Sequence, residues 1–477
     1  MSKKREVAHN SIIQFGSKAI STALGLVAVM IMTRYLGQEK FGWYTTTISF
    51  LQFIGIFIDF GLTPVTSQFL NEKEHDNERI FKNLLGFRLT SAIIFFGLAP
   101  IIALFFPYPT PVKIAIGLTT IHFIAVSLRQ VLTGFYQTKL KMYIHALGEL
   151  LGRVILVGGV WLLAYMGSSF LPFMAIVILG SVAYCGFLFV YAAKEHFAGF
   201  KFEWKIWKKI IKKMWPIALS IMFNVVYLKG DIVLLSLFRP QETVGVYGAA
   251  YKVIDILTES AMMTMGLLLP LLTYSWSRGL KEQFKKRFQQ SFDFMMALGT
   301  PAVVGTIMLA RPIMDFIAGE KFIESALPLQ ILSLAVFGVF LGAVFGHTAV
   351  AIDKQKKTLW VYIGDAILTL IGYLIFVPTY GILGAAWMSV FSELFAGIFL
   401  YFTIKKYVQT KLNFTTFGKI LFSSFAMAAI LYLLPSWHVL ILVPIGVVSY
   451  GAILLATGGI TVSTIQEIIS NRTNKTT

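Results

Sequence analysis

Long apolar segments are the feature that most restricts how this chain can fold. Runs of 18 or more mostly apolar residues recur from one end of the sequence to the other. At 1.5 Å per residue, such a run is long enough to cross the hydrocarbon core of a bilayer as a helix. Only 13% of the residues are charged, which is roughly half of what a soluble protein carries. The sequence therefore predicts an all-α, polytopic membrane protein.

The apolar segments predict about fourteen transmembrane helices. Their expected ranges are 11–33, 43–69, 81–105, 113–137, 143–165, 171–193, 215–237, 244–274, 289–317, 327–351, 358–377, 382–404, 416–434 and 439–459.

The lysines and arginines predict how these helices are oriented. With a cytoplasmic N-terminus, 29 of the 41 fall in cytoplasmic tails and loops, six in outer loops and helix ends, and six inside helices. This asymmetry follows the positive-inside rule, so we expect both termini in the cytoplasm and the chain in the cytoplasmic membrane. The net charge of +18 then reflects topology and some attraction to membrane lipids, and we expect no nucleic-acid partner.

The sequence contains little that suggests catalysis or cofactor binding. Its only cysteine, Cys185, lies in an expected span, which excludes an intrachain disulfide and a thiolate metal cluster. The seven histidines have no metal-ligand spacing, and we find no P-loop, nucleophile elbow or zinc motif. We therefore expect no cofactor, no metal and no enzyme activity.

The two halves of the chain resemble each other. The segment "RYLGQEKFGWY" (34–44) resembles "LFRPQETVGVY" (237–247), and "KMYIHALGE" (141–149) resembles "KTLWVYIGD" (357–365). Each half holds six spans, so both repeats have the same orientation, related by an axis along the membrane normal. Four pairs share an offset of 203 residues: Gln38 and Gln241, Glu39 and Glu242, Gly42 and Gly245, and Tyr44 and Tyr247.

This repeat predicts two pseudo-symmetric six-helix lobes followed by two extra helices. A basic linker joins the lobes, and its Trp204, Trp207, Ile210 and Ile211 lie opposite lysines, as in a helix that lies in the membrane interface. The expected parts are an N-terminal lobe (1–193), a cytoplasmic interfacial linker (194–214), a C-terminal lobe (215–406), and two helices with a cytoplasmic tail (407–477).

Cations inside the expected helices are the most informative polar residues. A Lys or Arg at the bilayer centre costs about 2.5–3.5 kcal/mol, so it normally faces a partner or a wet cavity. Together these cations form a graded series through the membrane, which suits the passage of an anionic head group. The candidate substrate-binding residues are Lys18, Arg88, Arg129, Arg153, Lys229 and Lys252.

Several of these residues have simpler explanations. Arg153 follows Glu149 by four residues, the favourable order for an ion pair within one helix. We favour snorkelling of Arg88 to the cytoplasmic interface. Lys18 and Arg129 have no opposite charge three or four residues away, which favours cavity lining.

Acidic residues in the spans are candidates for ion coupling. Residues 229 and 231 point to nearly opposite sides of a helix, so Lys229 and Asp231 need separate partners. The alternative is that Gly230 breaks the helix and the two charges satisfy freed backbone groups. Lys252 and Asp255 lie on one helix face and could neutralise each other. The candidate proton or sodium sites are Asp59, Asp231, Asp255 and Asp365.

Three segments carry a family resemblance. "RYLGQEKFGWY" after the first span, "DFGL" (59–62) and "VYGAAYKV" (246–253) resemble the polysaccharide-biosynthesis, O-antigen-type flippases of the multidrug/oligosaccharidyl-lipid/polysaccharide exporter superfamily. The resemblance implies two six-helix lobes around a central cavity, alternating access, and a lipid-pyrophosphate-linked sugar as cargo.

We therefore expect a flippase that moves a polyprenyl-pyrophosphate-linked oligosaccharide repeat unit to the outer leaflet for cell-surface polysaccharide synthesis. Lys18, Arg129, Arg153 and Lys229 would hold the pyrophosphate through charge-assisted hydrogen bonds. The alternatives are a cation-coupled drug exporter of the same superfamily, a peptidoglycan lipid-precursor flippase, and a membrane-embedded polymerase or glycosyltransferase. An enzyme of that last class would be expected to have a sizeable outer loop or an acidic catalytic motif.

Overall fold

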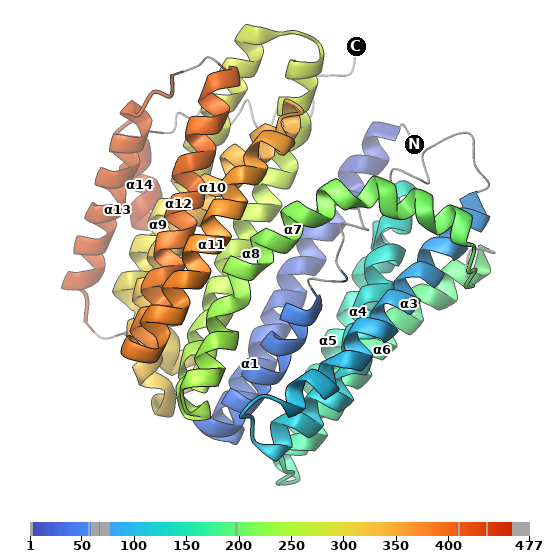
Figure 1. Cartoon of the computed structure of the whole chain (residues 1–477). Helices are drawn as coiled ribbons and strands as arrows, with labels where there is room; N and C mark the ends of the chain where they lie inside the picture. The colour runs from blue at the N-terminus through green and yellow to red at the C-terminus, as the bar shows by residue number, and fades with distance from the viewer. Residues whose placement is uncertain are drawn as a thin grey trace. The chain divides into compact units, whose positions relative to one another are not determined.

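The structure is a computed structural model, and the residues that it describes are almost entirely helical (Figure 1). It describes residues 3–55, 58, 66, 77–195, 199–408, 411–435 and 437–459, with the side chains of 3–15 and 213–229 left out. The helices are α1 (Lys3–Gly55), α3 (Asn77–Leu104), α4 (Thr110–Thr138), α5 (Met142–Tyr165), α6 (Phe170–Lys194), α7 (Trp204–Phe238), α8 (Gln241–Ser277), α9 (Lys281–Ala318), the short 3-10 helix η1 (Glu320–Ser325), α10 (Ala326–Ala351), α11 (Gln355–Tyr380), α12 (Ile382–Val408), α13 (Thr415–Leu433) and α14 (Val439–Ala456).

These helices confirm the predicted all-α membrane fold. Among the described residues, 12 helices are long and apolar enough to cross a membrane. The expected spans 11–33 and 43–69 both begin within α1, which turns at Gly37. Gly37 has φ 72°, a left-handed conformation that glycine adopts without a steric penalty. Helical geometry is interrupted at Gly37, so α1 consists of two helical segments that meet at a kink inside "RYLGQEKFGWY".

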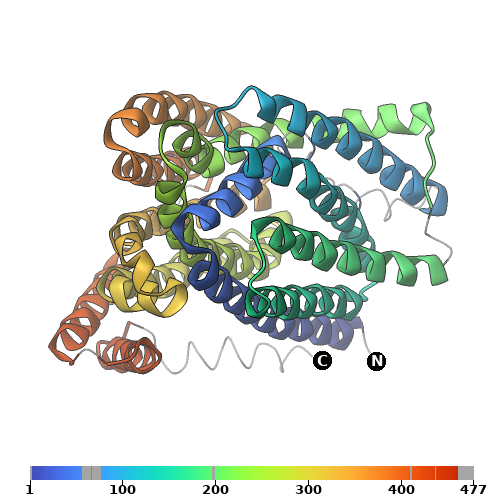
Figure 2. The same ribbon diagram turned by 90° about the horizontal axis from the view of Figure 1, so that it is seen from below.

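The chain divides into two compact units, which do not follow the two repeats. The first unit contains Met1–Gly248, Ile317–Lys321 and Tyr373–Ile382, and the remaining residues form the second unit. In the first unit, α5 packs between α1 and α6, and α4 packs between α3 and α6 (Figures 1 and 2). Helix α7 packs against α1 and α3 of the same unit. The lobe boundaries near residues 193 and 215 stay a prediction.

The repeated segments meet each other inside the first unit. A Cβ atom on Gly42 would overlap the carbonyl oxygen of Gln241, and a Cβ on Gly245 would overlap that of Gln38. Gly42 corresponds to Gly245 in the repeat, and Gln38 to Gln241, so the two contacts are reciprocal. Reciprocal contacts are what a two-fold relation between two segments produces. The Thr46 hydroxyl also donates to the side-chain oxygen of Gln241 at 2.6 Å.

The described part of the basic linker, which runs into the first turns of α7, packs on α3. The Asn83 amide of α3 donates to the Glu203 carboxylate at 3.0 Å and accepts from the Glu203 backbone N–H at 2.9 Å. Ile210 is fully buried, whereas Trp204 is 60% exposed. The interfacial prediction is therefore wrong for Ile210, because the apolar ends of α3, α4 and α6 cover it.

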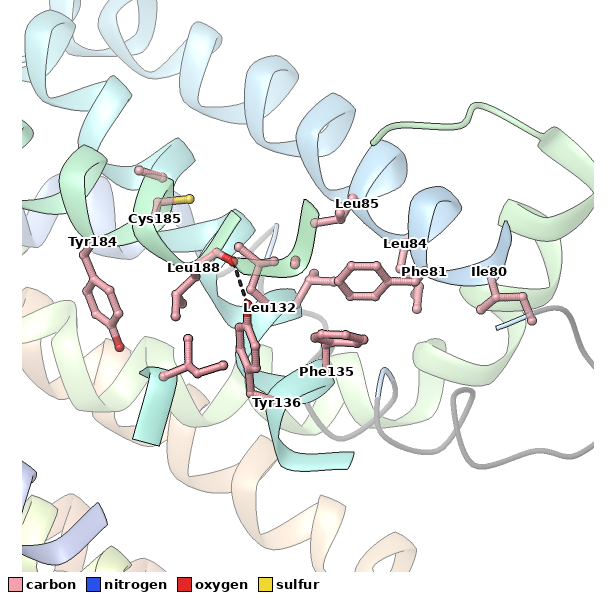
Figure 3. Packing of buried hydrophobic residues seen from close by; sticks show 14 of the residues in the cluster. Ile80, Phe81, Leu84, Leu85, Leu132, Phe135, Tyr136, Tyr184, Cys185 and Leu188 are labelled. Carbon is pink, nitrogen blue, oxygen red and sulfur yellow. Dashed lines mark hydrogen bonds between the residues drawn. The ribbon is translucent and has the colours of Figure 1, made fainter. Parts of the chain in front are cut away.

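Ile210 belongs to a cluster of buried apolar residues from these helix ends (Figure 3). The rings of Phe81 and Phe135 lie 4.8 Å apart. The hydroxyl of Tyr136 donates to the carbonyl of Leu188 at 2.7 Å. This core holds α3, α4 and α6 together, so the polar residues farther along α4 and α6 are carried on helices whose ends are fixed.

In the second unit, the segment between α12 and α13 is held by a side chain in a similar way. Gln289 of α9 donates to the carbonyl of Asn413 and accepts from its N–H, both at 2.9 Å. Asn413 lies just before α13, which packs on α14. An amide side chain near the start of α9 thus binds the chain after α12, as Asn83 of α3 binds the chain after α6.

Candidate functional site

Four helices of the first unit bring polar side chains together in the part of the fold that is expected to lie in the membrane. We define the cationic cluster as Lys18 of α1, Arg129 of α4, Glu149 and Arg153 of α5, and Tyr184 of α6. His122 of α4 lies within electrostatic reach of Arg129 and Arg153, and His145 of α5 lies within reach of Arg129 and Lys18. These shared neighbours show that three of the six predicted cations occupy one region.

The ion pair of the cluster joins two helices. The Lys18 ammonium lies 3.7 Å from a carboxylate oxygen of Glu149, and the side chains are 30% and 14% exposed. Among the described residues, Glu149 therefore forms its ion pair with Lys18 and not with Arg153, which follows it by four residues on the same helix. The sequence spacing could not identify this pair, because it depends on α1 packing beside α5.

Arg129 stacks on an aromatic ring instead of meeting a carboxylate. Its guanidinium carbon lies 4.4 Å from the centroid of the Tyr184 ring, a cation–π contact that leaves the edges of the guanidinium available for hydrogen bonds. The Tyr184 hydroxyl is 2.9 Å from Nε2 of His145. Tyr184 therefore orients both Arg129 and His145. The other histidine within reach of Arg129, His122, is hydrogen-bonded through Nδ1 to the hydroxyl of Ser181.

Arg153 lies against a glycine of the neighbouring helix. Its Nη1 atom is 3.2 Å from the place where a Cβ of Gly25 would stand. Any side chain at position 25 would have to push the guanidinium aside. Gly25 thus provides the space in which Arg153 can lie beside α1.

Arg88 is placed differently from the prediction. Its side chain is 1% exposed, and its guanidinium donates to the carbonyl of Ser127 at 3.3 Å, to the carbonyl of Ile58 and to the side chain of Gln130. The snorkelling prediction is wrong, because these groups bind the guanidinium inside the protein. A role in substrate binding stays a prediction.

The region around Asp231 shows how one charge of "YLKGD" is accommodated. Helix α7 continues through Gly230, so the alternative of a helix break at this glycine is wrong. Asp231 is fully buried and accepts from the Tyr247 hydroxyl at 2.9 Å and from the Ile232 N–H at 2.7 Å. Tyr247 belongs to the repeated segment at the start of α8. The side chain of Lys229 lies outside the described residues.

The other candidates are scattered over the chain. Asp59 lies outside the described residues, and Lys252 and Asp255 are half-buried on α8 in the second unit. Asp365 of the second unit is fully buried. Its carboxylate accepts from the Thr369 hydroxyl at 3.0 Å and from the Ser392 hydroxyl at 3.0 and 3.1 Å. Among the described residues no His, Cys, Asp and Glu side chains group as metal ligands.

The sequence interpretation missed the neutral residues of the site. Tyr184 and His145 had no distinctive spacing, and nothing in the sequence marks them except that His145 lies in the repeated segment 141–149. That repeat aligns Glu149 with Asp365, and both prove to be carboxylates held by partners on other helices. An acidic residue at the same place in each repeat was therefore the available signal.

Comparisons with known proteins agree with this picture. Residues 31–327 match the family described as polysaccharide biosynthesis protein. Among curated relatives, an uncharacterized membrane protein of Methanocaldococcus jannaschii is 25% identical over 64% of this chain and 61% of its own length. The "Probable low-salt glycan biosynthesis flippase Agl15" of Haloferax volcanii is 22% identical over 42% of this chain and 43% of its own. The chain thus spans less than two thirds of the length of these relatives.

Solved structures share the fold at low sequence identity. The lipid II flippase MurJ in an inward closed conformation matches with a TM-score of 0.75 and 15% identity over 96% of this chain and 99% of that one. An inward-facing multidrug resistance MATE family transporter matches with a TM-score of 0.66 and 12% identity, over 84% and 98%. Because the family match extends over more than half of the chain, the protein belongs to the polysaccharide biosynthesis protein family.

Proposed function

We propose that the protein is a flippase that moves a polyprenyl-pyrophosphate-linked oligosaccharide across the cytoplasmic membrane by alternating access, with both termini in the cytoplasm. The observation that carries this proposal is the cationic cluster, in which three cations and one carboxylate occupy one region among the described residues. A pyrophosphate group offers the negative charge and the acceptor oxygens that guanidinium and ammonium groups bind best. Its family and the flippase named among its relatives support the same reading.

The same charges disfavour a drug exporter with cationic cargo. A cation entering beside Lys18, Arg129 and Arg153 would meet like charges in a region of low dielectric constant, where repulsion is stronger than in water. The carboxylate found there among the described residues, Glu149, is already paired with Lys18. An anionic cargo reverses the sign of these interactions.

Ion coupling through Asp365 is part of the proposal. Its carboxylate is buried with two hydroxyl groups from Thr369 and Ser392. A buried carboxylate is stabilised by taking up a proton, and oxygen atoms of this kind also suit a small hard cation. We therefore rank Asp365 above Asp255, which is only half-buried, as the group that takes up a proton or sodium ion.

Transport in proteoliposomes tests the proposal. Purified full-length protein is reconstituted with a fluorescent polyprenyl-pyrophosphate-linked oligosaccharide, and a lectin added outside measures how fast the sugar reaches the outer leaflet. Replacing Lys18, Arg129 and Arg153 together with glutamine should reduce the rate at least about tenfold, because each lost charge-assisted contact weakens pyrophosphate binding. The control is Lys139→Gln, a cation outside the cluster that lies over the Phe135 ring. Unchanged transport by the triple variant would rule out the cluster as the cargo site.

A further inference from the structure

Among the residues that the structure describes, Glu149 is the carboxylate of the cationic cluster, and a negative charge at this place needs an explanation. It lies on α5, while the ammonium that it pairs with lies on α1. Arg129, Arg153 and Glu149 all lie within electrostatic reach of the Tyr184 hydroxyl. A negative charge in a site for an anionic cargo competes with that cargo, so its presence needs a physical reason.

A purely structural role explains the pair poorly. Helices α1 and α5 already pack closely along their length, and Arg153 of α5 lies directly against Gly25 of α1. The pair itself is not sealed in the core, because Lys18 is 30% and Glu149 is 14% exposed. Helix packing and the contact of Arg153 with Gly25 therefore join α1 to α5 without this pair. The 3.7 Å separation is also longer than that of a tight N–H to carboxylate hydrogen bond.

The empty state of the site gives a better reason. Three cations held together in a low-dielectric region repel one another, and this repulsion disfavours the empty site unless an anion is present. Glu149 supplies one anion from within the protein. Since the pair is partly exposed and loosely spaced, another anion can replace Glu149 beside Lys18 without opening a packed core.

We propose that Glu149 is an internal counter-anion that occupies Lys18 while the site is empty and is displaced when the pyrophosphate group of the cargo binds. This inference rests on the proposed function and adds a regulation of the same site. Glu149 lowers the affinity of the cluster for the cargo and, after transport, takes Lys18 back so that the cargo leaves. The side chain is thus a positioning and competing group, and it makes no contact with the cargo itself.

Binding of inorganic pyrophosphate to the purified full-length protein measures this competition. Isothermal titration calorimetry compares wild type with Glu149→Gln, which keeps the size of the side chain and removes its charge. We expect Glu149→Gln to bind pyrophosphate about tenfold more tightly, since the competitor for Lys18 is gone. The matched control is Glu195→Gln, which removes the carboxylate of another Lys–Glu pair, that of Lys141 just before α5 with Glu195 just after α6. It should change the affinity less than about twofold.

Repeating the comparison in Lys18→Gln protein tests whether the effect depends on the Lys18–Glu149 ion pair. In Lys18→Gln protein the ammonium is absent, so adding Glu149→Gln should change the pyrophosphate affinity by less than about threefold, as expected for coupled residues in a double-mutant cycle. Glu149→Asp keeps the charge on a shorter side chain and should give an intermediate affinity. In proteoliposomes Glu149→Gln should also slow the turnover of the lipid-linked cargo, because release lacks its competitor.

The outcomes separate this inference from the function on which it rests. If wild type binds pyrophosphate and the triple glutamine variant does not, the anion site stands. In that case an unchanged affinity of Glu149→Gln, or the same gain in the Lys18→Gln background, overturns the role of Glu149 alone. If wild type does not bind pyrophosphate, both proposals fail. Size-exclusion profiles and melting temperatures identify any variant that is misfolded. If Glu149→Gln is misfolded, the pyrophosphate affinity of Glu149→Asp is compared with that of wild type instead.

Discussion

Replacing Gly42 with alanine should destabilise the protein, although alanine is the better helix former. The Cβ atom of the new residue would overlap the carbonyl oxygen of Gln241 at the start of α8. The atom in its way is backbone, which cannot rotate aside like a side chain. The segment after Gly37 in α1 and the start of α8 must therefore move apart where they cross.

The size of the effect follows from what this separation disturbs. Overpacking a close contact costs typically about 1–3 kcal/mol. The hydrogen bond from Thr46 to Gln241, at 2.6 Å, lies at the same crossing, and its loss adds about 1 kcal/mol. We therefore expect a destabilisation of about 2–4 kcal/mol. Gly245→Ala should act similarly through Gln38, and the double variant should cost less than the sum, because one separation relieves both overlaps.

Thermal unfolding in detergent, followed by the fluorescence of a thiol-reactive dye at Cys185, measures this difference. The matched control is Gly158→Ala in α5, where an added Cβ meets no atom within 4 Å. An open helical glycine replaced by alanine usually gains about 0.4–1 kcal/mol. The melting temperature should thus fall for Gly42→Ala and rise slightly for Gly158→Ala. A Gly42→Ala protein that melts at or above the wild-type temperature would refute the crossing geometry.

Two further perturbations test contacts away from the cationic cluster. Hydrogen bonds from Arg79 and Asn83 lower the pKa of Glu203 from 4.5 to about 2, so the carboxylate stabilises the docked linker above about pH 4.5 and loses this effect as the pH falls towards 2. Hydrogen exchange of residues 199–203 at neutral pH should be faster in Glu203→Gln, and unchanged exchange would contradict this. Tyr247→Phe removes a donor to the buried Asp231 carboxylate and should destabilise the protein by about 1.5–3 kcal/mol. A melting temperature equal to that of wild type would show that this bond is not needed.

Much of the fold followed from local properties of the sequence. Span length and hydropathy predicted the helices, because a segment in lipid must satisfy its own backbone hydrogen bonds whatever its neighbours are. The repeat at an offset of 203 residues identified Gly42 and Gly245 as equivalent. It did not indicate that the two glycines lie at the same crossing.

The partners of the buried charges were decided only by the tertiary structure. Lys18 meets Glu149 of another helix, Arg129 meets the Tyr184 ring, and Arg88 is enclosed by carbonyl groups instead of reaching the interface. Spacing along one helix tells which side chains share a face, and it says nothing about which face of a second helix will lie opposite. That choice depends on the fit of small residues such as Gly25 against long ones such as Arg153. The close packing of helices that are far apart in sequence therefore sets the chemistry of the site.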